Sequence, residues 1–366
     1  MIEARQRRLV DRSGDGVARA LALPIRVPAR ATASVWRLGL AVLLAALEAC
    51  APPRPVAPPP PEPRANWDEA TFAHKSIPSF TLTIPEGGRP GETLIGQVAT
   101  YRVREGDTLL DVARYYDLGY NEIVEANPGV DPWVPKPGTV LTLPTAWVLP
   151  CCTYRGVVLN IPEMRLFYYR RVKGHPQETV VYTFPVGLGR DDRRTPRGSF
   201  RVSGKTVNPQ WNIPESIRQE HIKERHDART FIRGGAEDNP LGKYRIELGG
   251  SLYSIHGTDI PWGVGMQVSH GCSRLYPEDI ERMFPLVPVG TPVEFIYQPV
   301  KVGSRDGATY VEVHRDIYRH ERSLYRDARA ALARRDPKPH IDEHELDAAV
   351  KGATGTPVRV SPPAAG

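Results

Sequence analysis

The chain has 366 residues, 40% of them hydrophobic and 25% charged, the balance of a globular protein with a sizeable core. Its length suggests two or three domains. The formal net charge is +6, but eight arginines against four acidic residues in residues 1–49 leave only +2 for the rest of the chain. No Lys/Arg-rich patch interleaved with aromatic residues occurs there, so nucleic acid is excluded as the expected partner.

An apolar stretch leads up to Cys50. In RLGLAVLLAALEAC, residues 37–50, one arginine precedes about a dozen apolar residues. The run is too short to cross ~30 Å of hydrocarbon as a helix but suits the apolar part of a secretory signal. Its end resembles a bacterial lipobox, although Glu48 departs from the small or apolar residue usual there. The resemblance implies a signal segment with a long basic extension over residues 1–49, acylation of Cys50, and a periplasmic lipoprotein anchored to the membrane; an uncleaved signal anchor is the alternative.

Proline dominates residues 50–66, which follow the signal segment. The run APPRPVAPPPPEPR cannot form helix or sheet and favours polyproline II. At ~3.1 Å per residue, this linker would hold the next domain roughly 40 Å from the membrane. Residues 67–98 are assigned as a connecting segment.

Residues 99–144 predict a strand, two short helices and a strand. Tyr101 and Val103 alternate with arginines, and Asp107 or Thr108 is placed to cap a helix. The opening YRVREGDTL and the close PKPGTVLTLP resemble the LysM module, a βααβ unit, which implies binding to N-acetylglucosamine-containing glycan. The residues alone indicate a compact α+β unit, and a spacer that binds no glycan is the alternative.

Short strands dominate residues 153–300. Alternating or apolar runs punctuated by glycine and proline predict strands, and helix is expected only over residues 213–229 and 277–284. The runs are GVVLNIPEMRLFYYRR, TVVYTFPVGLG, RRTPRGSFRVSGK, LYSIHGTD, GCSRL and GTPVEFIYQPV. Many short strands predict a mostly β domain, a sandwich or barrel with short helices.

Cys272 stands in the stretch MQVSHGCSRL and has four interpretations: a disulfide, a metal ligand, a buried inert thiol or a nucleophile. A disulfide to the adjacent pair Cys151 and Cys152 would leave one thiol odd, and no CxxC or HxxxH spacing supports a metal site with His256 and His270. We therefore expect no metal.

The nucleophile interpretation fits best. A thiolate forms when a neighbour lowers its pKa, and His256, sixteen residues earlier, is a suitable base if adjacent strands bring the two together. Gly271 allows close approach of a substrate, and the amides of Gly271 and Cys272 would donate to a developing oxyanion.

The stretch SIHGTDIPWGVGMQVSHGCSRL resembles the signature of YkuD-type L,D-transpeptidases. FPVGLGRDDRRTPRGSFRV and DNPLGKYRIELGG match the same family in order, and the resemblance to the ErfK/YbiS group covers roughly residues 80–315. It implies a YkuD-type β-sandwich or barrel, preceded by the LysM-like unit, and an enzyme without a cofactor.

The resemblance assigns roles to the residues of this motif. Cys272 is the nucleophile, His256 its base and later its acid, and the Gly257 carbonyl holds the imidazole tautomer. Ser269, His270 and Gly271 shape the loop and the oxyanion site. Arg274 meets a substrate carboxylate or organises the loop, with a buried ion pair to Glu278 or Asp279 as the alternative. Trp211 and Trp262 wall the groove or simply pack. Ser273 departs from the apolar residue usual in the family, which leaves local packing in doubt.

The implied reaction acts on peptidoglycan glycan strands with their peptide stems. Cys272 attacks the third-residue carbonyl of a tetrapeptide stem, releases D-alanine and holds a thioester; acylation of Cys272 by carbapenems is a further expectation. The acceptor stays open: a stem amine gives a 3→3 cross-link, a lysine of an outer-membrane lipoprotein anchors that protein, and water makes the enzyme an L,D-carboxypeptidase. The rivals are a non-enzymatic lipoprotein that tethers membrane to wall and, more weakly, a cysteine peptidase.

Residues 301–366 are expected to form a strand, a helix and a disordered tail. Ile317, Leu324, Ala328 and Ala331 predict the apolar face of the helix, and proline, glycine and alanine increase from residue 337 onward.

Overall fold

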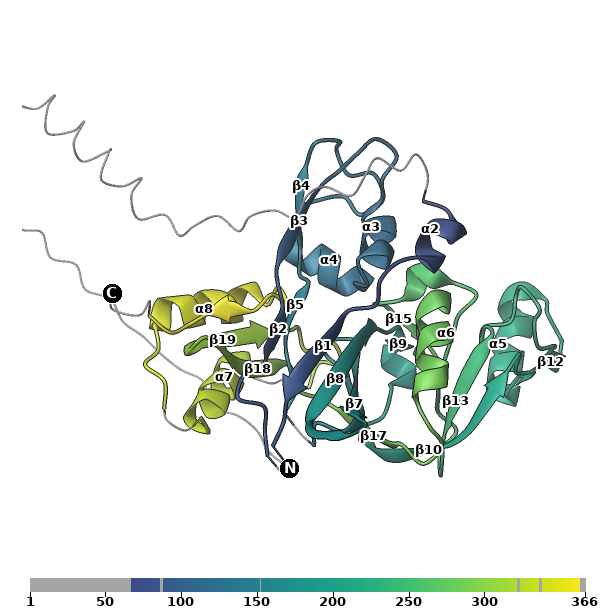
Figure 1. Ribbon diagram of the computed structural model, residues 1–366. Helices are drawn as coiled ribbons and strands as arrows, with labels where there is room; N and C mark the ends of the chain where they lie inside the picture. The colour runs from purple at the N-terminus through teal and green to yellow at the C-terminus, as the bar shows by residue number, and fades with distance from the viewer. Residues whose placement is uncertain (1–66, 86–87, 152, 321–322, 336–337, 363–366) are drawn as a thin grey trace, which may run out of the picture. The chain divides into compact units, whose positions relative to one another are not determined.

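The computed structural model describes residues 67–85, 88–151, 153–320, 323–335 and 338–362 (Figure 1). The predictions of a signal segment, an acylated Cys50 and a proline-rich linker lie outside the described residues. Within the described ranges, no helix is both long enough and apolar enough to span a membrane.

A nine-stranded sheet is the centre of the fold. Its strands run in the order β1 (Ser79–Thr83), β8 (His175–Pro185), β7 (Arg165–Val172), β6 (Gly156–Asn160), β17 (Pro292–Ile296), β10 (Gly198–Val207), β13 (Tyr244–Leu248), β14 (Ser254–His256) and β16 (Ser273–Arg274). Neighbouring strands are antiparallel, except that β17 beside β6 and β14 beside β16 are parallel. The predicted fold class, mostly β with short helices, is confirmed.

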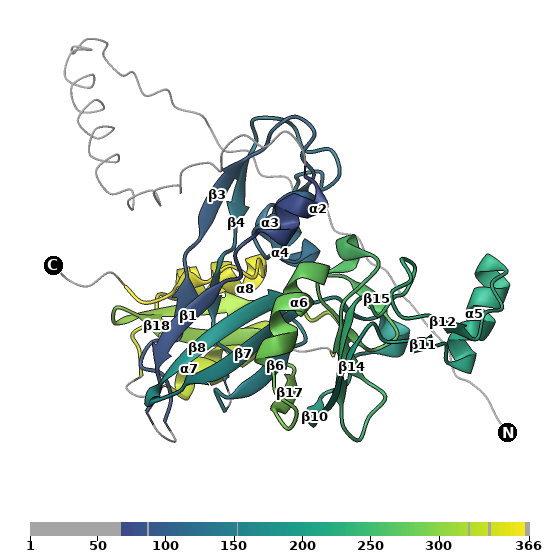
Figure 2. The same ribbon diagram turned by 45° about the vertical axis from the view of Figure 1, so that its right-hand side comes forward.

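Both faces of the sheet are buried at its centre. On β7, Leu166 and Tyr168 pack into one hydrophobic core, and the alternate residues Phe167 and Tyr169 pack into a second. Successive side chains of a strand point to opposite faces, so this continuous apolar run needs cover on both sides. Helix α6 (Pro277–Leu286) contributes Ile280 to the first core and lies against the sheet (Figure 2). The unit over residues 99–144 supplies the cover for the second core.

This unit has the predicted order of strand, helix, helix and strand: β3 (Ala99–Arg102), α3 (Leu109–Tyr115), α4 (Tyr120–Ala126) and β4 (Val140–Leu143). Thr108 is the N-cap of α3, because its hydroxyl accepts from the Asp111 amide at 3.1 Å. The other candidate cap, Asp107, instead accepts from the Tyr101 hydroxyl at 2.7 Å. That bond ties the turn back to the first strand.

Buried ion pairs join this unit to the main sheet. Glu122 on α4 pairs with Arg165 on β7 at 2.9 Å, and Arg114 on α3 pairs with Glu278 on α6 at 2.9 Å. Removing one partner of a buried pair leaves an uncompensated charge. These contacts therefore favour one arrangement of the unit against the sheet.

Residues 67–98 are more than a connection, which corrects their assignment. They contain α2 (Glu69–Ala73), strand β1, which pairs with β8, and β2 (Leu94–Gly96), which pairs with β5 (Ala146–Val148). Lys75 is buried, and its ammonium lies 2.6 Å from Asp117 and 2.9 Å from Asp279. The segment thus belongs to the sheet and to its core.

The C-terminal residues form a further unit with its own hydrophobic core. Strands β18 (Val300–Arg305), β19 (Ala308–Val313) and β20 (Val358–Arg359) form its sheet, and α7 (Leu324–Ala333) and α8 (Glu343–Gly352) contribute to the core. The expected helix is α7, but Ile317 precedes it. The expected disorder is wrong for residues 338–362, because Leu346 and Val360 are fully buried and Asp342 caps α8.

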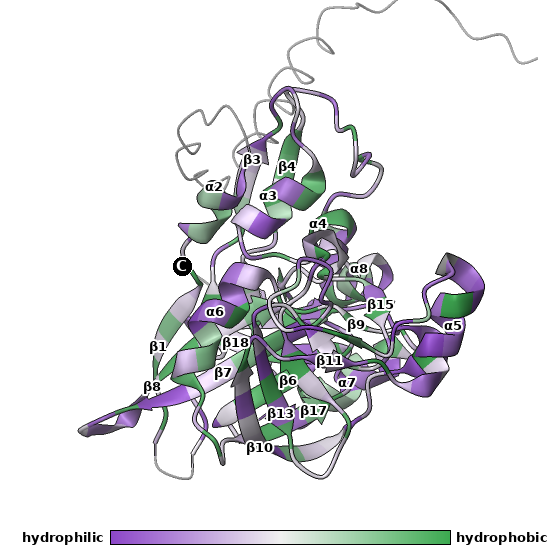
Figure 3. Cartoon of the chain, turned by 90° about the vertical axis from the view of Figure 1, so that its right-hand side faces the viewer, coloured by the Kyte–Doolittle hydropathy of each residue, from purple (hydrophilic) through white to green (hydrophobic). Residues whose placement is uncertain are grey.

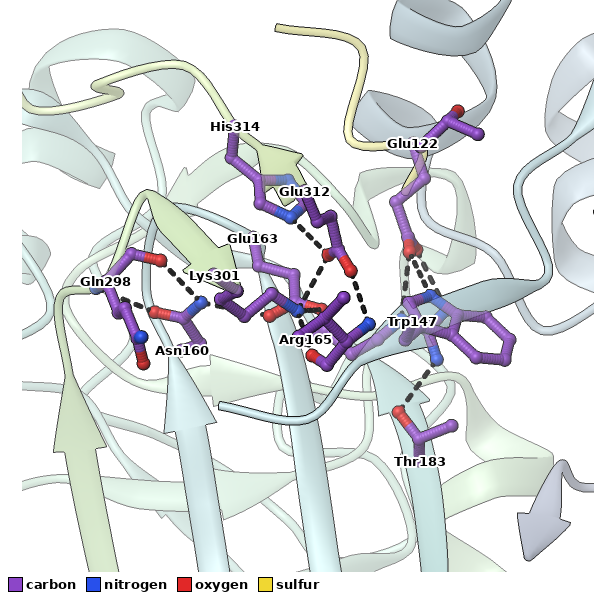
Figure 4. Close-up of polar contacts among 12 residues, drawn as sticks. Glu122, Trp147, Asn160, Glu163, Arg165, Thr183, Gln298, Lys301, Glu312 and His314 are labelled. Carbon is purple, nitrogen blue, oxygen red and sulfur yellow. Dashed lines mark hydrogen bonds and ion pairs between the residues drawn. The ribbon is translucent and has the colours of Figure 1, made fainter. Parts of the chain in front are cut away.

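A buried ion network joins the C-terminal unit to the main sheet (Figure 4). The Lys301 ammonium lies 2.7 Å from Glu163 and 2.7 Å from Glu312, and His314 lies 2.6 Å from Glu312. Burial raises the pKa of Glu163, and Lys301 opposes that shift. The two carboxylates and the imidazole are close enough to ligate a metal ion, but Lys301 already supplies the positive charge that they need.

Short elements cluster beside β13, β14 and β16. They are β9 (Leu188–Gly189) paired with β15 (Gln267–Ser269), β11 (Trp211–Asn212) paired with β12 (Phe231–Ile232), and helix α5 (Glu215–Arg225), which is shorter than predicted. Helix α5 is largely hydrophilic (Figure 3), in keeping with its sequence ESIRQEHIKER. Such a helix has little apolar surface to bury, so its polar contacts become important.

Candidate active site

Three neighbouring strands bring the predicted site residues together. Across β13, β14 and β16, Arg245 lies opposite His256, and His256 lies opposite Arg274. Ser254 lies beside Cys272, with its hydroxyl oxygen 3.7 Å from the cysteine sulfur. All five side chains line one cavity of about 410 Å³. The pairing of β14 with β16 thus brings His256 and Cys272 close together, although they are sixteen residues apart in sequence. No disulfide joins Cys272 to the other described cysteine, Cys151.

His256 is buried, and one tautomer is fixed by its neighbour. Its Nδ1 lies 2.7 Å from the Gly257 carbonyl oxygen, and because a carbonyl only accepts, Nδ1 carries the proton and Nε2 keeps its lone pair. Burial, reinforced by the charges of Arg274 and Arg245, lowers the pKa of His256 to about 3. The ring makes no hydrogen bond to the Cys272 thiol in the described structure, a separation that is common before substrate binds. At neutral pH the imidazole is a neutral proton acceptor.

The lowered pKa of His256 predicts a pH-dependent stability. Because the folded-state value lies below the ordinary value of 6.5, the unfolded chain takes up this proton first as the pH falls. The contribution is complete above pH 6.5 and is lost as the pH falls toward about 3, at about 1.4 kcal/mol per pH unit. Urea unfolding should therefore show wild type losing about 2 kcal/mol more than His256→Gln between pH 7 and pH 5. The exposed His175→Gln variant serves as the control and should follow wild type; parallel profiles for wild type and His256→Gln would contradict the prediction.

Hydrogen bonds clip the loop that carries Cys272. Ser269 donates its hydroxyl to the Cys272 carbonyl at 2.6 Å and accepts from the Gly271 amide at 3.1 Å. Thr195 donates to the Gly271 carbonyl at 3.1 Å. Gly271 has a φ of +111°, and a Cβ there would lie 2.7 Å from the Tyr253 ring, so the position requires glycine. The Gly271 amide, one of the two predicted oxyanion donors, donates to Ser269 in this structure, and the role of the Cys272 amide stays a prediction.

His270 fastens helix α5 to the loop. Its Nε2 lies 2.9 Å from one oxygen of the Glu220 carboxylate, and the other oxygen of that carboxylate accepts from Arg190 at 2.9 Å. The hydrogen bond from Arg190 has the larger effect and that from His270 the next largest, and together they lower the pKa of Glu220 to about 2. His270 thus lines the same cavity as His256, but its Nε2 is engaged by a carboxylate on α5.

Of the remaining predicted residues, some lie where the sequence analysis placed them and others do not. Trp211 lines the cavity, whereas Trp262 is exposed and does not line it, which corrects its placement. The alternative of an ion pair between Arg274 and Glu278 or Asp279 is wrong, because Glu278 is paired with Arg114 and Asp279 with Lys75. Ser273 is fully buried, and its hydroxyl has no hydrogen-bond partner among the described residues, so the departure noted there does leave a polar atom in the core.

Comparison with known proteins shows to which family the chain belongs. Residues 154–295 match the L,D-transpeptidase catalytic domain, and residues 101–144 match the LysM domain. The Escherichia coli K12 protein named "Probable L,D-transpeptidase ErfK/SrfK" is 38% identical over 299 residues, 79% of this chain and 93% of the relative. The chain belongs to the L,D-transpeptidase family. The "Probable L,D-transpeptidase YbiS" of the same strain is 36% identical over 74% of this chain and 90% of the relative. Among solved structures, the catalytic domain of the Enterococcus faecium L,D-transpeptidase overlaps 39% of this chain and 96% of its own, at 19% identity and a TM-score of 0.28.

Sequence reasoning missed four residues of this L,D-transpeptidase site. Ser254 and Arg245 were detectable, because a residue two before His256 on the same strand shares its face, and Arg245 sits in the strand that precedes it. Thr195 and Glu220 were not, because a turn and a helix bring them to the loop from 76 and 50 residues away in sequence.

Proposed function

We propose that this L,D-transpeptidase acts on peptidoglycan, with Cys272 as the nucleophile and His256 as its base. One observation carries the proposal: His256 on β14 and Cys272, the residue immediately before the adjacent parallel strand β16, line one cavity, and the Gly257 carbonyl leaves Nε2 of His256 able to accept a proton. Burial keeps that imidazole neutral, so it is available over the whole range above about pH 4.

The thiol proton passes to Nε2 as the sulfur attacks the carbonyl carbon of the third residue of a tetrapeptide stem. The Cys272 amide donates to the oxyanion. When the tetrahedral intermediate collapses, the amide bond breaks, the imidazolium returns its proton to the leaving amine, and D-alanine departs. The product is a thioester on Cys272. An amine then attacks the thioester carbonyl and gives a proton to His256; the carbon–sulfur bond breaks, and His256 returns the proton to the departing sulfur.

Hydrogen bonds around Ser269 support the same roles. They fix the Cys272 carbonyl and the Gly271 amide, so the nucleophile is presented from a loop with little freedom. Arg274 and Trp211 are proposed to contact substrate from the cavity wall. The LysM-like unit is proposed to hold the glycan strand, and a lipid on Cys50 to anchor the enzyme in the periplasm.

The full-length protein incubated with disaccharide-tetrapeptide and followed by mass spectrometry tests the proposal. A dimer lighter by one alanine, absent with Cys272→Ala, is the expected result for a stem amine as acceptor. Cys272-dependent loss of alanine without a dimer would indicate water as the acceptor, or an enzyme whose acyl group awaits a protein lysine. If neither product forms, while wild type and Cys272→Ala bind the glycan equally, a wall-tethering lipoprotein replaces the enzyme.

A further inference from the structure

Two arginines flank the histidine of the site. Arg245, His256 and Arg274 are register partners on the adjacent strands β13, β14 and β16. Residues that face one another across neighbouring strands share a face of the sheet, with Cβ atoms about 4.5–5.5 Å apart. The three side chains therefore form one row along the cavity that they line.

Neither guanidinium is fully satisfied within the protein. The Nε atoms of Arg245 and Arg274 are buried and have no hydrogen-bond partner among the described residues. The carboxylate of Glu247 is 3.9 Å from Arg245, beyond hydrogen-bonding distance. By contrast, the buried Arg165 holds its carboxylate at 2.9 Å. Buried charged donors without partners are rare, so these two point to an anionic ligand.

The reaction places an anion at this row. The carbonyl under attack lies at Cys272, two residues before Arg274, and the leaving nitrogen must lie within hydrogen-bonding reach of His256 to receive its proton. The leaving residue carries its α-carboxylate on the carbon attached to that nitrogen. From Arg274, two residues after Cys272, the row of register partners runs past His256 to Arg245 on β13.

We propose that Arg245, assisted by Arg274, binds the α-carboxylate of the leaving amino acid and thereby determines donor specificity. The inference rests on the proposed function. A stem that ends one residue after the scissile bond presents a carboxylate to Arg245. A longer stem presents a neutral amide there and leaves the guanidinium unpaired, and sites built for a polar group reject ligands that lack it.

The test compares two donors, the disaccharide-tetrapeptide with a free terminal carboxylate and the same compound as its terminal amide. Release of alanine or alaninamide gives kcat/KM for each. Wild type should prefer the carboxylate roughly 10- to 100-fold, as for a charge-assisted hydrogen bond. Arg245→Gln should lose this preference, because kcat/KM falls more for the carboxylate donor than for the amide donor, and Arg245→Lys should retain part of the preference. The exposed Arg170→Gln is the matched control and should behave as wild type.

Folding of Arg245→Gln is checked by the rate at which iodoacetamide, a neutral reagent, alkylates Cys272. An equal loss on both donors would show a structural role and overturn the proposal, as would a wild type that does not distinguish them. If wild type releases product from neither donor, the proposed function itself fails and this inference with it.

Discussion

Replacing His256 with glutamine is expected to slow acylation of Cys272 by roughly 10³-fold, within the range of general base catalysis. Glutamine is neutral and polar, but its amide cannot accept the thiol proton. In the wild type, the Gly257 carbonyl holds the ring so that Nε2 is the acceptor. The measurement is intact mass after incubation with a carbapenem, read as the rate at which one drug mass adds to the protein, with Cys272→Ala defining the background.

The same substitution at His270 is the matched control. His270 lies two residues before Cys272 but contacts Glu220 on α5. We expect His270→Gln to slow acylation by less than about tenfold, through loosening of the loop. Equal losses for the two variants, or a larger loss at His270, would remove His256 from the role of base.

Replacing Lys301 with methionine is expected to destabilise the protein by about 3–5 kcal/mol. Lys301 is fully buried, and methionine leaves Glu163 and Glu312 facing each other without their cation. Because the two carboxylates then take up protons more readily in the folded state, the loss should shrink as the pH is lowered toward 5. Urea unfolding at pH 7.5 and pH 5 measures both effects.

Lys351 provides the matched control for that experiment. Its ammonium lies 2.6 Å from Asp347, one helical turn away, in an exposed ion pair, and such pairs contribute no more than about 0.5 kcal/mol. Lys351→Met should therefore unfold nearly as wild type does. Adding Glu163→Gln to Lys301→Met should recover part of the loss, since one buried charge is removed. A Lys301→Met protein within about 1 kcal/mol of Lys351→Met would contradict the electrostatic account.

Local patterns in the sequence predicted the features that depend on neighbouring residues, such as turns, helix caps and strands. The turn and cap at Asp107 and Thr108 located the βααβ unit, and glycine-punctuated β runs located the strands. The spacing from His256 to Cys272 fitted adjacent strands because the parallel pairing of β14 and β16 needs a connection of that length.

Contacts between distant segments were out of reach. The alternative of an ion pair between Arg274 and Glu278 is wrong because Glu278 pairs with Arg114, 164 residues away in sequence, on a helix of the LysM-like unit. Strand β1 was overlooked because it is short and half exposed, and its place in the sheet depends on pairing with β8. Only the part of the C-terminal unit after residue 337 was expected to be disordered, because its few apolar residues, such as Leu346 and Val360, become significant only when packed together.

The buried pairs Glu122–Arg165 and Arg114–Glu278 hold the LysM-like unit against the domain that carries Cys272. Two linked binding sites raise the effective concentration of the second partner only where the spacing of the sites matches the spacing on the ligand. A glycan strand bound by this unit would place its peptide stems at the thiol only where the distance along the glycan matches the distance between the unit and Cys272. The enzyme would then modify the wall polymer at intervals set by the repeat length of the glycan.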